Sequence, residues 1–472
     1  MPSVALALAA GLALLATPPA TPEEPFARGV LVSGVACRSD PAQTYTLYLP
    51  TAYTPERRWP AMLVLDPAGR GDEAAERFRG IAEAHGWILL SSNDVHSAGP
   101  AEGNQRAVTA MWHEVRERVA SDPRRIYAAG FSGGGIMAYA LGYGTGGLAG
   151  VIASGARFRS GDERKPLRFP CFGAAGDADF NYLEMHDAHA VLAGWGTPER
   201  LEVFPGRHEW MPVEMAARAA DWLELHAMRQ GLRPPDPELV ERFAAADLRA
   251  AEELERSGSQ LDASRRLRQL AADLAELRPA EEVAALAARA ERLAASPGAR
   301  REAADRKRLD DEERGTLLAF SAAATAVLRD DAPPLAQRFE GGIGLDAWQR
   351  RTGRPGYEGV VARRVLDTYL MRCGAMLGPQ MLAQGEPAKA ALFLQVAAKI
   401  APDRPGPRYN LACALARAGS RRAALEALEK AVELGFADAA GMAADADLAT
   451  LREEPRFVAL LAALRAGPGP AP

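Results

Sequence analysis

Apolar and polar positions alternate in two different ways along this chain. Between residue 27 and about residue 230, short apolar runs of strand length are separated by longer segments with helical periodicity. The apolar runs are 45–49, 61–65, 87–91, 126–130, 150–154, 171–175 and 201–204, and the helical segments are 72–84, 105–119, 134–141, 182–192 and 213–229. This alternation predicts an α/β fold in which a mostly parallel sheet carries helices on both faces.

The rest of the chain is predicted to be helical. Pro234, Pro235 and Pro237 mark a linker after the last α/β segment. From residue 238 onward, Ala, Leu, Arg and Glu recur with helical periodicity, and no segment has a convincing strand pattern. We therefore expect an all-helical region to follow the α/β domain.

A repeat with a period of 34 residues lies in the last part of this helical region. Its aligned positions are Leu377 with Leu411, Gly378 with Ala412, Gly385 with Gly419, Ala390 with Ala424, Ala397 with Ala431 and Pro402 with Phe436. The period and the small residues resemble those of tetratricopeptide repeats, which pair antiparallel helices. The resemblance implies two helix pairs over 371–438, while a chance match between alanine-rich helices is the alternative.

These patterns divide the chain into four parts. They are a leader at 1–25, the α/β domain at 26–232, a helical region at 233–370, and the repeats with a capping helix at 371–466. In the leader, the apolar run 4–16 is shorter than the roughly 20 residues that span a bilayer. It is typical of a signal peptide followed by a Pro/Thr-rich segment. We expect export to the periplasm or medium and no transmembrane segment; a disordered alanine-rich start is the alternative.

Charge and cysteine content exclude several other classes of protein. The formal net charge is −5 and no basic patch is present, so we expect no nucleic-acid partner. The four cysteines, Cys37, Cys171, Cys373 and Cys413, form no C-x-x-C pair. A zinc ribbon or a thioredoxin motif is therefore not available. In an exported protein Cys37 and Cys171 could form a disulfide, and free buried thiols are the other possibility.

The motif that indicates chemistry is Gly130-Phe131-Ser132-Gly133-Gly134. It follows an apolar run of strand character and runs into a helical segment. A serine between a strand and a helix sits on a sharp turn that only small neighbours tolerate. The turn exposes the hydroxyl beside the positive end of the helix dipole. We therefore expect Ser132 to be a nucleophile.

A serine hydroxyl needs a base, and the base needs a partner that orients it. Three of the seven histidines precede Ser132, and three others lie within helical segments. His208 instead follows the last predicted strand, at the sheet edge where such folds keep their sites. The strand-end pattern G-x-x-D selects Asp179 as its partner, and Asp177 is the alternative acid.

The remaining site residues are expected in the neighbouring loops. A tetrahedral intermediate needs backbone donors for its oxyanion, here the N–H of Gly133 and one from the loop after the run 61–65. Because Pro67 has no N–H, the second donor should be Ala68 or Gly69. Three aromatic residues could line the substrate pocket, although each could equally be ordinary packing: Phe131, Tyr182 and Trp210.

Residues 40–230 resemble the esterase and depolymerase branch of the α/β-hydrolases, which includes polyhydroxybutyrate depolymerases and feruloyl esterases. The matching segments are Tyr45–Pro50, Asp122–Tyr127, Gly130–Gly134, Gly176–Asp179 and Gly206–His208. The resemblance implies a Ser132–Asp179–His208 hydrolase with no metal or cofactor. Its substrate would be a small-molecule or polymeric ester. The chain departs from that branch at Asp66-Pro67, where the branch usually carries His-Gly.

Three functions remain open from the sequence. The leading one is a carboxylic-ester hydrolase whose helical repeats bind a protein partner or support the catalytic domain. The second is a catalytically idle domain that serves as the scaffold of a tetratricopeptide interaction protein, which the altered Asp66-Pro67 favours. The third is a peptidase, which uses the same catalytic groups.

Overall fold

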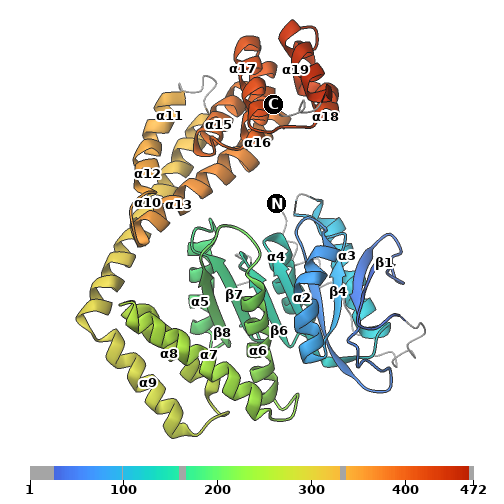
Figure 1. Cartoon of the computed structure of the whole chain (residues 1–472), viewed down its shortest axis with the longest axis vertical. Helices are drawn as coiled ribbons and strands as arrows, with labels where there is room; N and C mark the ends of the chain where they lie inside the picture. The colour runs from blue at the N-terminus through green and yellow to red at the C-terminus, as the bar shows by residue number, and fades with distance from the viewer. Residues whose placement is uncertain (1–25, 98, 159–165, 330–335, 467–472) are drawn as a thin grey trace, which may run out of the picture. The chain divides into compact units, whose positions relative to one another are not determined.

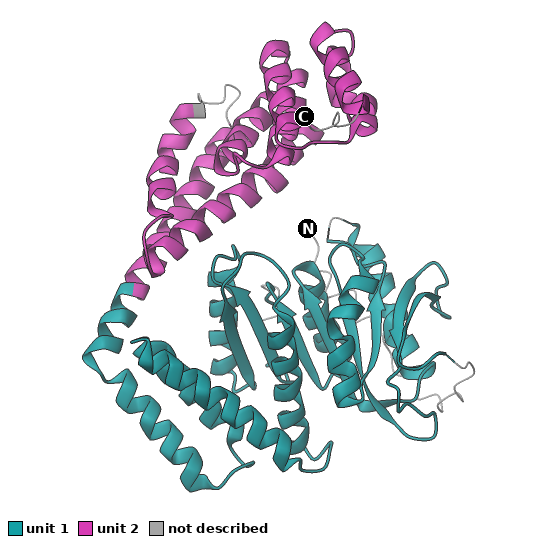
Figure 2. Cartoon of the chain, in the orientation of Figure 1, with its two compact units in different colours: residues 1–305 teal, residues 306–472 magenta. Residues whose placement is uncertain are grey.

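The computed structural model describes residues 26–97, 99–158, 166–329 and 336–466. The chain forms two compact units, residues 1–305 and residues 306–472, and the boundary falls within helix α10 (Pro297–Arg329) (Figure 2). The expected leader, 1–25, lies outside the described residues. Among the described helices, none combines the length and the apolar character that crossing a membrane would require.

The first unit contains an eight-stranded sheet in the order β1-β2-β4-β3-β5-β6-β7-β8. Figure 1 labels β1, β4, β6, β7 and β8 of this sheet. β1 and β2, and likewise β2 and β4, pair antiparallel, and all other neighbours pair parallel. This confirms the predicted α/β class with a mostly parallel sheet. The strands are β1 (Leu31–Ala36), β2 (Thr44–Tyr48), β3 (Trp59–Leu65), β4 (Ile88–Ser92), β5 (Ser121–Phe131), β6 (Gly150–Ser154), β7 (Cys171–Gly176) and β8 (Glu199–Phe204).

The sequence pattern did not predict the edge strand β1. Gly34 lies inside it with φ of +66°, and the pairing with β2 shifts register between Val32 and Val35. Such a bulge breaks the alternation of inward and outward side chains. Half of β1 is exposed and only Val35 is buried, so the strand lacks the continuous apolar run that marks the inner strands.

Helices cover both faces of the sheet, as predicted. The apolar core on one face contains Val108 of α3 (Ala101–Glu117), Leu141 of α4 (Gly133–Thr145) and Leu192 of α5 (Tyr182–Gly194). The core on the other face contains Phe78 of α2 (Gly71–His85) and Trp222 of α6 (Val213–Arg229). Strands buried on both faces are apolar throughout, which is why their sequences read as continuous runs.

Helices α7 (Pro237–Arg256), α8 (Gln260–Leu274) and α9 (Ala280–Ala294) also belong to the first unit. A buried ion network joins α7 and α8 to the edge strand β8. Arg200 of β8 binds Asp247 of α7 at 2.9 Å and also pairs with Asp273 of α8. Three arginines meet three carboxylates there, so the charges balance: Arg200, Arg218 and Arg266 with Glu202, Asp247 and Asp273.

The second unit is helical throughout its described residues. Its elements after α10 are α11 (Ala336–Gly342), α12 (Leu345–Arg351), α13 (Tyr357–Leu370), the π-helix η1 (Met371–Leu377), α14 (Gly378–Ala383), α15 (Pro387–Ile400), α16 (Pro405–Arg417), α17 (Arg421–Glu433), α18 (Ala439–Ala444), the 3₁₀-helix η2 (Ala446–Leu451) and α19 (Pro455–Ala466). The wide turns of η1 end just before Pro379 of α14. A proline ring collides with the carbonyl four residues earlier in a regular helix, and a π segment relieves that collision.

The 34-residue register corresponds to equivalent positions in α14–α15 and α16–α17. Gly385 and Gly419 both lie between the helices of a pair with φ of +78°, which glycine adopts most easily. The paired alanines are fully buried, with 0% exposure at Ala390, Ala397, Ala424 and Ala431. The assignment of these helices to the tetratricopeptide class stays a prediction.

The four cysteines are free and buried, so Cys37 and Cys171 do not form a disulfide. Burial raises the pKa of the Cys37 thiol to about 12 and raises that of Cys171 as well. Because a thiol must ionise to react, both are held in an unreactive form.

Glu202 gives the buried ion network a pH dependence that can be measured. Burial would raise the pKa of Glu202, but Arg200, Arg218 and Arg266 outweigh burial and lower it to about 2. This value lies below the roughly 4.3 of an unfolded chain. Glu202 therefore stabilises the fold above about pH 4.3 and loses that contribution as the pH falls toward 2.

We predict that Glu202→Gln destabilises the first unit most near neutral pH. The difference from wild type in free energy of unfolding should shrink by about 1–2 kcal/mol between about pH 5 and 3. Urea unfolding followed by tryptophan fluorescence measures this, because every tryptophan except Trp348 lies in the first unit. Glu214→Gln, which alters an exposed carboxylate, is the control. A difference that does not change with pH would contradict the prediction.

Candidate active site

Ser132 lies on a strained turn between β5 and α4, with φ of 50° and ψ of −121°. The flanking glycines make this turn possible. A Cβ on Gly130 would stand 2.3 Å from the carbonyl carbon of Gly134, and a Cβ on Gly134 would stand 1.9 Å from the carbonyl oxygen of Leu65. The Ser132 N–H donates to the carbonyl of Ser154 at 2.9 Å, which ties the turn to β6. The G-x-S-x-G pattern therefore reflects tight packing of backbone on backbone.

The structure brings Ser132, His208 and Asp179 together from three different loops. His208 Nε2 lies 2.9 Å from Ser132 Oγ. His208 Nδ1 lies 2.9 Å and 3.0 Å from the two carboxylate oxygens of Asp179. Asp179 is fully buried after β7, while His208 keeps 18% of its side chain exposed after β8. The hydroxyl, imidazole and carboxylate thus form one continuous hydrogen-bonded chain.

Asp177, the alternative acid, occupies a different position. Its Oδ1 accepts a hydrogen bond from the N–H of Gly206 at 3.1 Å, in the turn that follows β8. Asp179 Oδ1 also accepts from the N–H of Asn181 at 2.7 Å, which orients its carboxylate toward His208. Asp177 therefore shapes the loop that carries His208, and Asp179 is the carboxylate that contacts the imidazole.

Two residues that hold the loop of His208 in place, Ser154 and Gly155, were not predicted from the sequence. Ser154 Oγ accepts from the N–H of Met211 at 2.9 Å and donates to the carbonyl of Glu209 at 3.2 Å, so it holds the His208 loop on both sides. Gly155 follows with φ of +58°, and a Cβ there would stand 3.0 Å from both Asp179 Oδ2 and His208 Nδ1. The only signal for Ser154 and Gly155 in the sequence was their position at the end of the predicted strand 150–154.

Aromatic rings surround the imidazole of His208. The ring of Phe131 lies 4.7 Å from it and that of Phe180 lies 4.1 Å from it, between centroids. Trp210 packs beside Phe131 at 5.7 Å. The ring of Tyr182 instead packs on His186 at 4.3 Å. Phe180 was not predicted, although it directly follows Asp179 in the sequence.

The loop after β3 does not leave the expected backbone donors free. The N–H of Ala68 donates to Asp66 Oδ1 at 2.9 Å, and the N–H of Gly69 donates to the carbonyl of Asp66 at 3.3 Å. The expectation that Ala68 or Gly69 offers a free amide is therefore not met. Both acceptors belong to Asp66: its side chain folds back onto Ala68, as aspartate often does in turns, and its carbonyl accepts from Gly69.

Asp66 also joins this loop to the one that carries His208. It is buried, and its Oδ2 accepts from Trp210 Nε1 at 2.9 Å while Arg70 Nε lies 3.2 Å from its Oδ1. Burial would raise the pKa of this carboxyl, but the hydrogen bonds from Trp210, Ala68 and Arg70 outweigh burial and lower it. Asp66 is thus held as a carboxylate with each oxygen occupied.

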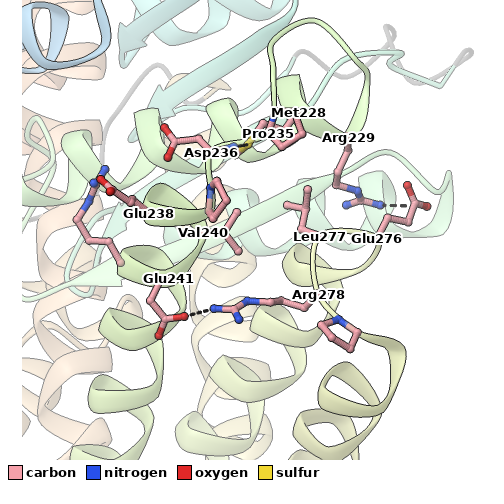
Figure 3. Close-up of a pocket in the computed structure, with 13 residues that line it drawn as sticks. Met228, Arg229, Pro235, Asp236, Glu238, Val240, Glu241, Glu276, Leu277 and Arg278 are labelled. Carbon is pink, nitrogen blue, oxygen red and sulfur yellow. Dashed lines mark hydrogen bonds and ion pairs between the residues drawn. The ribbon is translucent and has the colours of Figure 1, made fainter.

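A cavity of about 940 Å³ lies elsewhere in the first unit, where the α6–α7 connection meets the α8–α9 connection (Figure 3). Charged residues on its wall pair with one another: Glu241 with Arg278, and Arg229 with Glu276 at 4.0 Å. None of Ser132, Asp179 and His208 lines it. Its paired charges give it a structural explanation as the junction of two helix connections.

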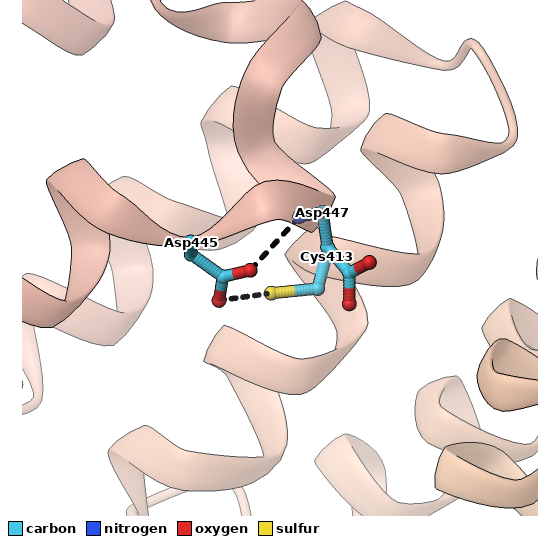
Figure 4. A group of neighbouring side chains, drawn as sticks. All are labelled: Cys413, Asp445 and Asp447. Atoms are coloured by element: carbon cyan, nitrogen blue, oxygen red, sulfur yellow. Dashed lines mark hydrogen bonds between the residues drawn. The ribbon is translucent and has the colours of Figure 1, made fainter.

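Cys413, Asp445 and Asp447 form a cluster of possible metal ligands in the second unit (Figure 4). Their acceptor atoms already have protein partners. Asp445 accepts from the N–H of Asp447 at 2.9 Å and from Tyr409 at 2.7 Å, and Arg417 lies 3.2 Å from Asp447. Asp445 thereby caps η2, and burial raises the pKa of the Cys413 thiol. The cluster is explained as a helix cap.

No protein-family model matches this sequence, and no curated protein matches it either. Solved structures similar to the chain include FphF, a fluorophosphonate-binding serine hydrolase of Staphylococcus aureus, at 16% identity and a TM-score of 0.33 over 38% of this chain and 92% of that one. Est1E of Butyrivibrio proteoclasticus is 12% identical, with a TM-score of 0.32 over 40% and 95%. Esterase 2 of Thermogutta terrifontis is 14% identical, with a TM-score of 0.34 over 44% and 96%.

The topology of the first unit identifies its fold. The strand order 1-2-4-3-5-6-7-8, with a serine on a turn between β5 and α4, is the arrangement of an α/β-hydrolase sheet and its nucleophile turn. The chain is therefore an α/β-hydrolase-like domain followed by a long all-helical region.

Gly155 offers a test of this geometry that does not depend on activity. We predict that Gly155→Ala shifts or removes the low-field proton NMR signal that a hydrogen bond between His208 Nδ1 and Asp179 gives. Gly196→Ala is the matched control, because Gly196 also has positive φ, +69°, but has no atom within 4 Å of the added methyl group. Both variants should lose some stability from the strained backbone. An unchanged signal in Gly155→Ala would contradict the described contact.

Proposed function

We propose that the first unit is a serine hydrolase that cleaves carboxylic esters through an acyl-enzyme intermediate. The observation that carries the proposal is the hydrogen-bonded chain from Asp179 through His208 to Ser132, with 2.9 Å at each of its two links. A weak nucleophile beside a base that a third group orients is the signature of nucleophilic catalysis. The strained turn at Ser132 supports it further, because nothing in the packing of a plain strand-to-helix connection requires such strain.

The proposed reaction assigns each of the three residues one task. Ser132 Oγ attacks the ester carbonyl carbon while its proton passes to His208 Nε2. The imidazolium then protonates the departing alkoxide, and the acyl group stays on Ser132. Water attacks next, gives its proton to the same nitrogen, and Ser132 leaves with that proton restored. Asp179 keeps the Nδ1 proton of His208 in place and stabilises the imidazolium when it forms.

The aromatic surroundings fit this assignment. Phe131 and Phe180 lie against the imidazole with centroids 4.7 Å and 4.1 Å away, and they limit the orientations that it can take. An apolar wall beside the nucleophile suits an uncharged acyl or alcohol group.

A catalytically idle scaffold is the second candidate, and one observation favours it. The amides of Ala68 and Gly69 are both engaged within their own loop, so neither of the two expected backbone donors is free to bind an oxyanion. Loss of one such donor lowers turnover by about 10²–10³-fold and does not abolish it. The two candidates therefore differ in whether purified protein turns over any ester at all.

We predict turnover of p-nitrophenyl esters of graded chain length by wild type, with p-nitroanilides included to test for peptidase activity. Ser132→Ala should lower kcat by about 10⁴–10⁶-fold without changing the melting temperature appreciably. Asp179→Asn should lower kcat by about 10⁴-fold, because the amide favours the wrong imidazole tautomer. Asp177→Asn is its matched control and should lose far less, since Asp177 contacts Gly206 and not the imidazole. Turnover that survives in Ser132→Ala would refute the proposal.

A further inference from the structure

If Ser132 attacks an ester, as the proposed function requires, the site needs a second oxyanion donor. The charge on a tetrahedral intermediate needs fixed donors aimed at one point. Gly133 supplies the first, because it begins α4 and the first N–H groups of a helix have no partner within the helix. With the amides of Ala68 and Gly69 engaged elsewhere, a second donor must come from another group beside Gly133.

Ser97 is the group that the fold brings beside Gly133. A Cβ on Gly133 would stand only 2.0 Å from Ser97 Oγ. The hydroxyl therefore lies against the Cα of Gly133, at the start of α4. A methyl group at position 133 would therefore displace the Ser97 hydroxyl.

Several hydrogen bonds hold Ser97 in this place. The N–H of Ser97 donates to the carbonyl of Pro67 at 2.8 Å, and His96 forms an isolated antiparallel bridge with Ala68. Asn104 binds both the N–H and the carbonyl of His96 at 2.8 Å. These bonds hold the loop after β4 across the loop after β3. Because β3 lies between β4 and β5 in the sheet, Ser97 reaches over β3 to the turn that follows β5.

The Ser97 hydroxyl is available to donate a hydrogen bond. The side chain is exposed, and within the described part of the chain its Oγ makes no hydrogen bond. A serine hydroxyl rotates freely and carries one proton to donate. It can therefore turn toward an oxygen atom that arrives beside the N–H of Gly133.

We propose that the Ser97 hydroxyl is the second oxyanion donor, in place of the amides of Ala68 and Gly69. As Ser132 Oγ bonds to the carbonyl carbon, the carbonyl oxygen gains negative charge and accepts hydrogen bonds from Gly133 N–H and Ser97 O–H. No proton is transferred to the oxygen, and the charge returns to the carbonyl when the alkoxide leaves. Asp66 fixes the loop against which Ser97 is held, which accounts for the departure at Asp66-Pro67.

The test compares Ser97 variants on the best ester of the graded series. Ser97→Ala should lower kcat by about 10²–10³-fold with little change in KM, because the lost bond forms only in the transition state. Ser97→Thr keeps a hydroxyl and should retain most of the activity. Ser97→Cys, whose thiol is a weak donor of similar shape, should behave like Ser97→Ala. Ser33→Ala, on exposed residue 33 of β1, is the control for a serine substitution in the same unit.

A second measurement separates an oxyanion donor from a merely structural role. A trifluoromethyl ketone that forms a tetrahedral adduct with Ser132 should bind Ser97→Ala more weakly by about the same factor as kcat/KM falls. Equal kcat in wild type and Ser97→Ala, in an enzyme that needs Ser132, would overturn this inference alone. A drop in kcat with unchanged binding of the ketone would also overturn it. A wild type that turns over no ester would overturn the proposed function and this inference with it.

Discussion

The strained turn at Ser132 is the constraint on which the rest of the site depends. It exists because β3, β5 and α4 approach so closely that Gly130 and Gly134 leave no space for a side chain. Parallel pairing places the ends of β6 and β7 beside the end of β5, so Ser154 and Asp179 can hold the His208 loop. The parallel sheet thus positions the proposed catalytic groups at the carboxyl ends of its strands, where the loops are free to carry chemistry.

Much of the first unit follows from local pattern. Continuous apolar runs indicate strands buried on both faces, and the G-x-S-x-G spacing indicates the turn. β1 could not be predicted, because the bulge at Gly34 removes the alternation that would mark it. The linker at 234–237 was predicted, but the attachment of α7 and α8 to the sheet depends on Arg200, Asp247 and Asp273, which meet only in three dimensions.

The candidate site also contains residues that the sequence predicts and residues that it does not. Ser132, His208 and Asp179 could be selected because each follows a strand at a position that the fold defines. The oxyanion loop could not, since Ala68 is engaged by the side chain of Asp66 and Gly69 by its backbone carbonyl, and neither contact can be read from the sequence. Ser97 could not be predicted for a similar reason. Its hydroxyl lies beside Gly133 only because the loop after β4 crosses the loop after β3. Interactions between loops carry no periodic signal in sequence.

The central claim is that Ser132 is an activated nucleophile, and covalent labelling tests it most directly. Purified wild type is treated with a fluorophosphonate probe, digested, and the modified residue is identified by mass spectrometry. Our account predicts one label per chain, located on Ser132, and a labelling rate that falls sharply in His208→Ala. Absence of label on a folded protein, or label on another residue while Ser132 stays unmodified, would contradict the account.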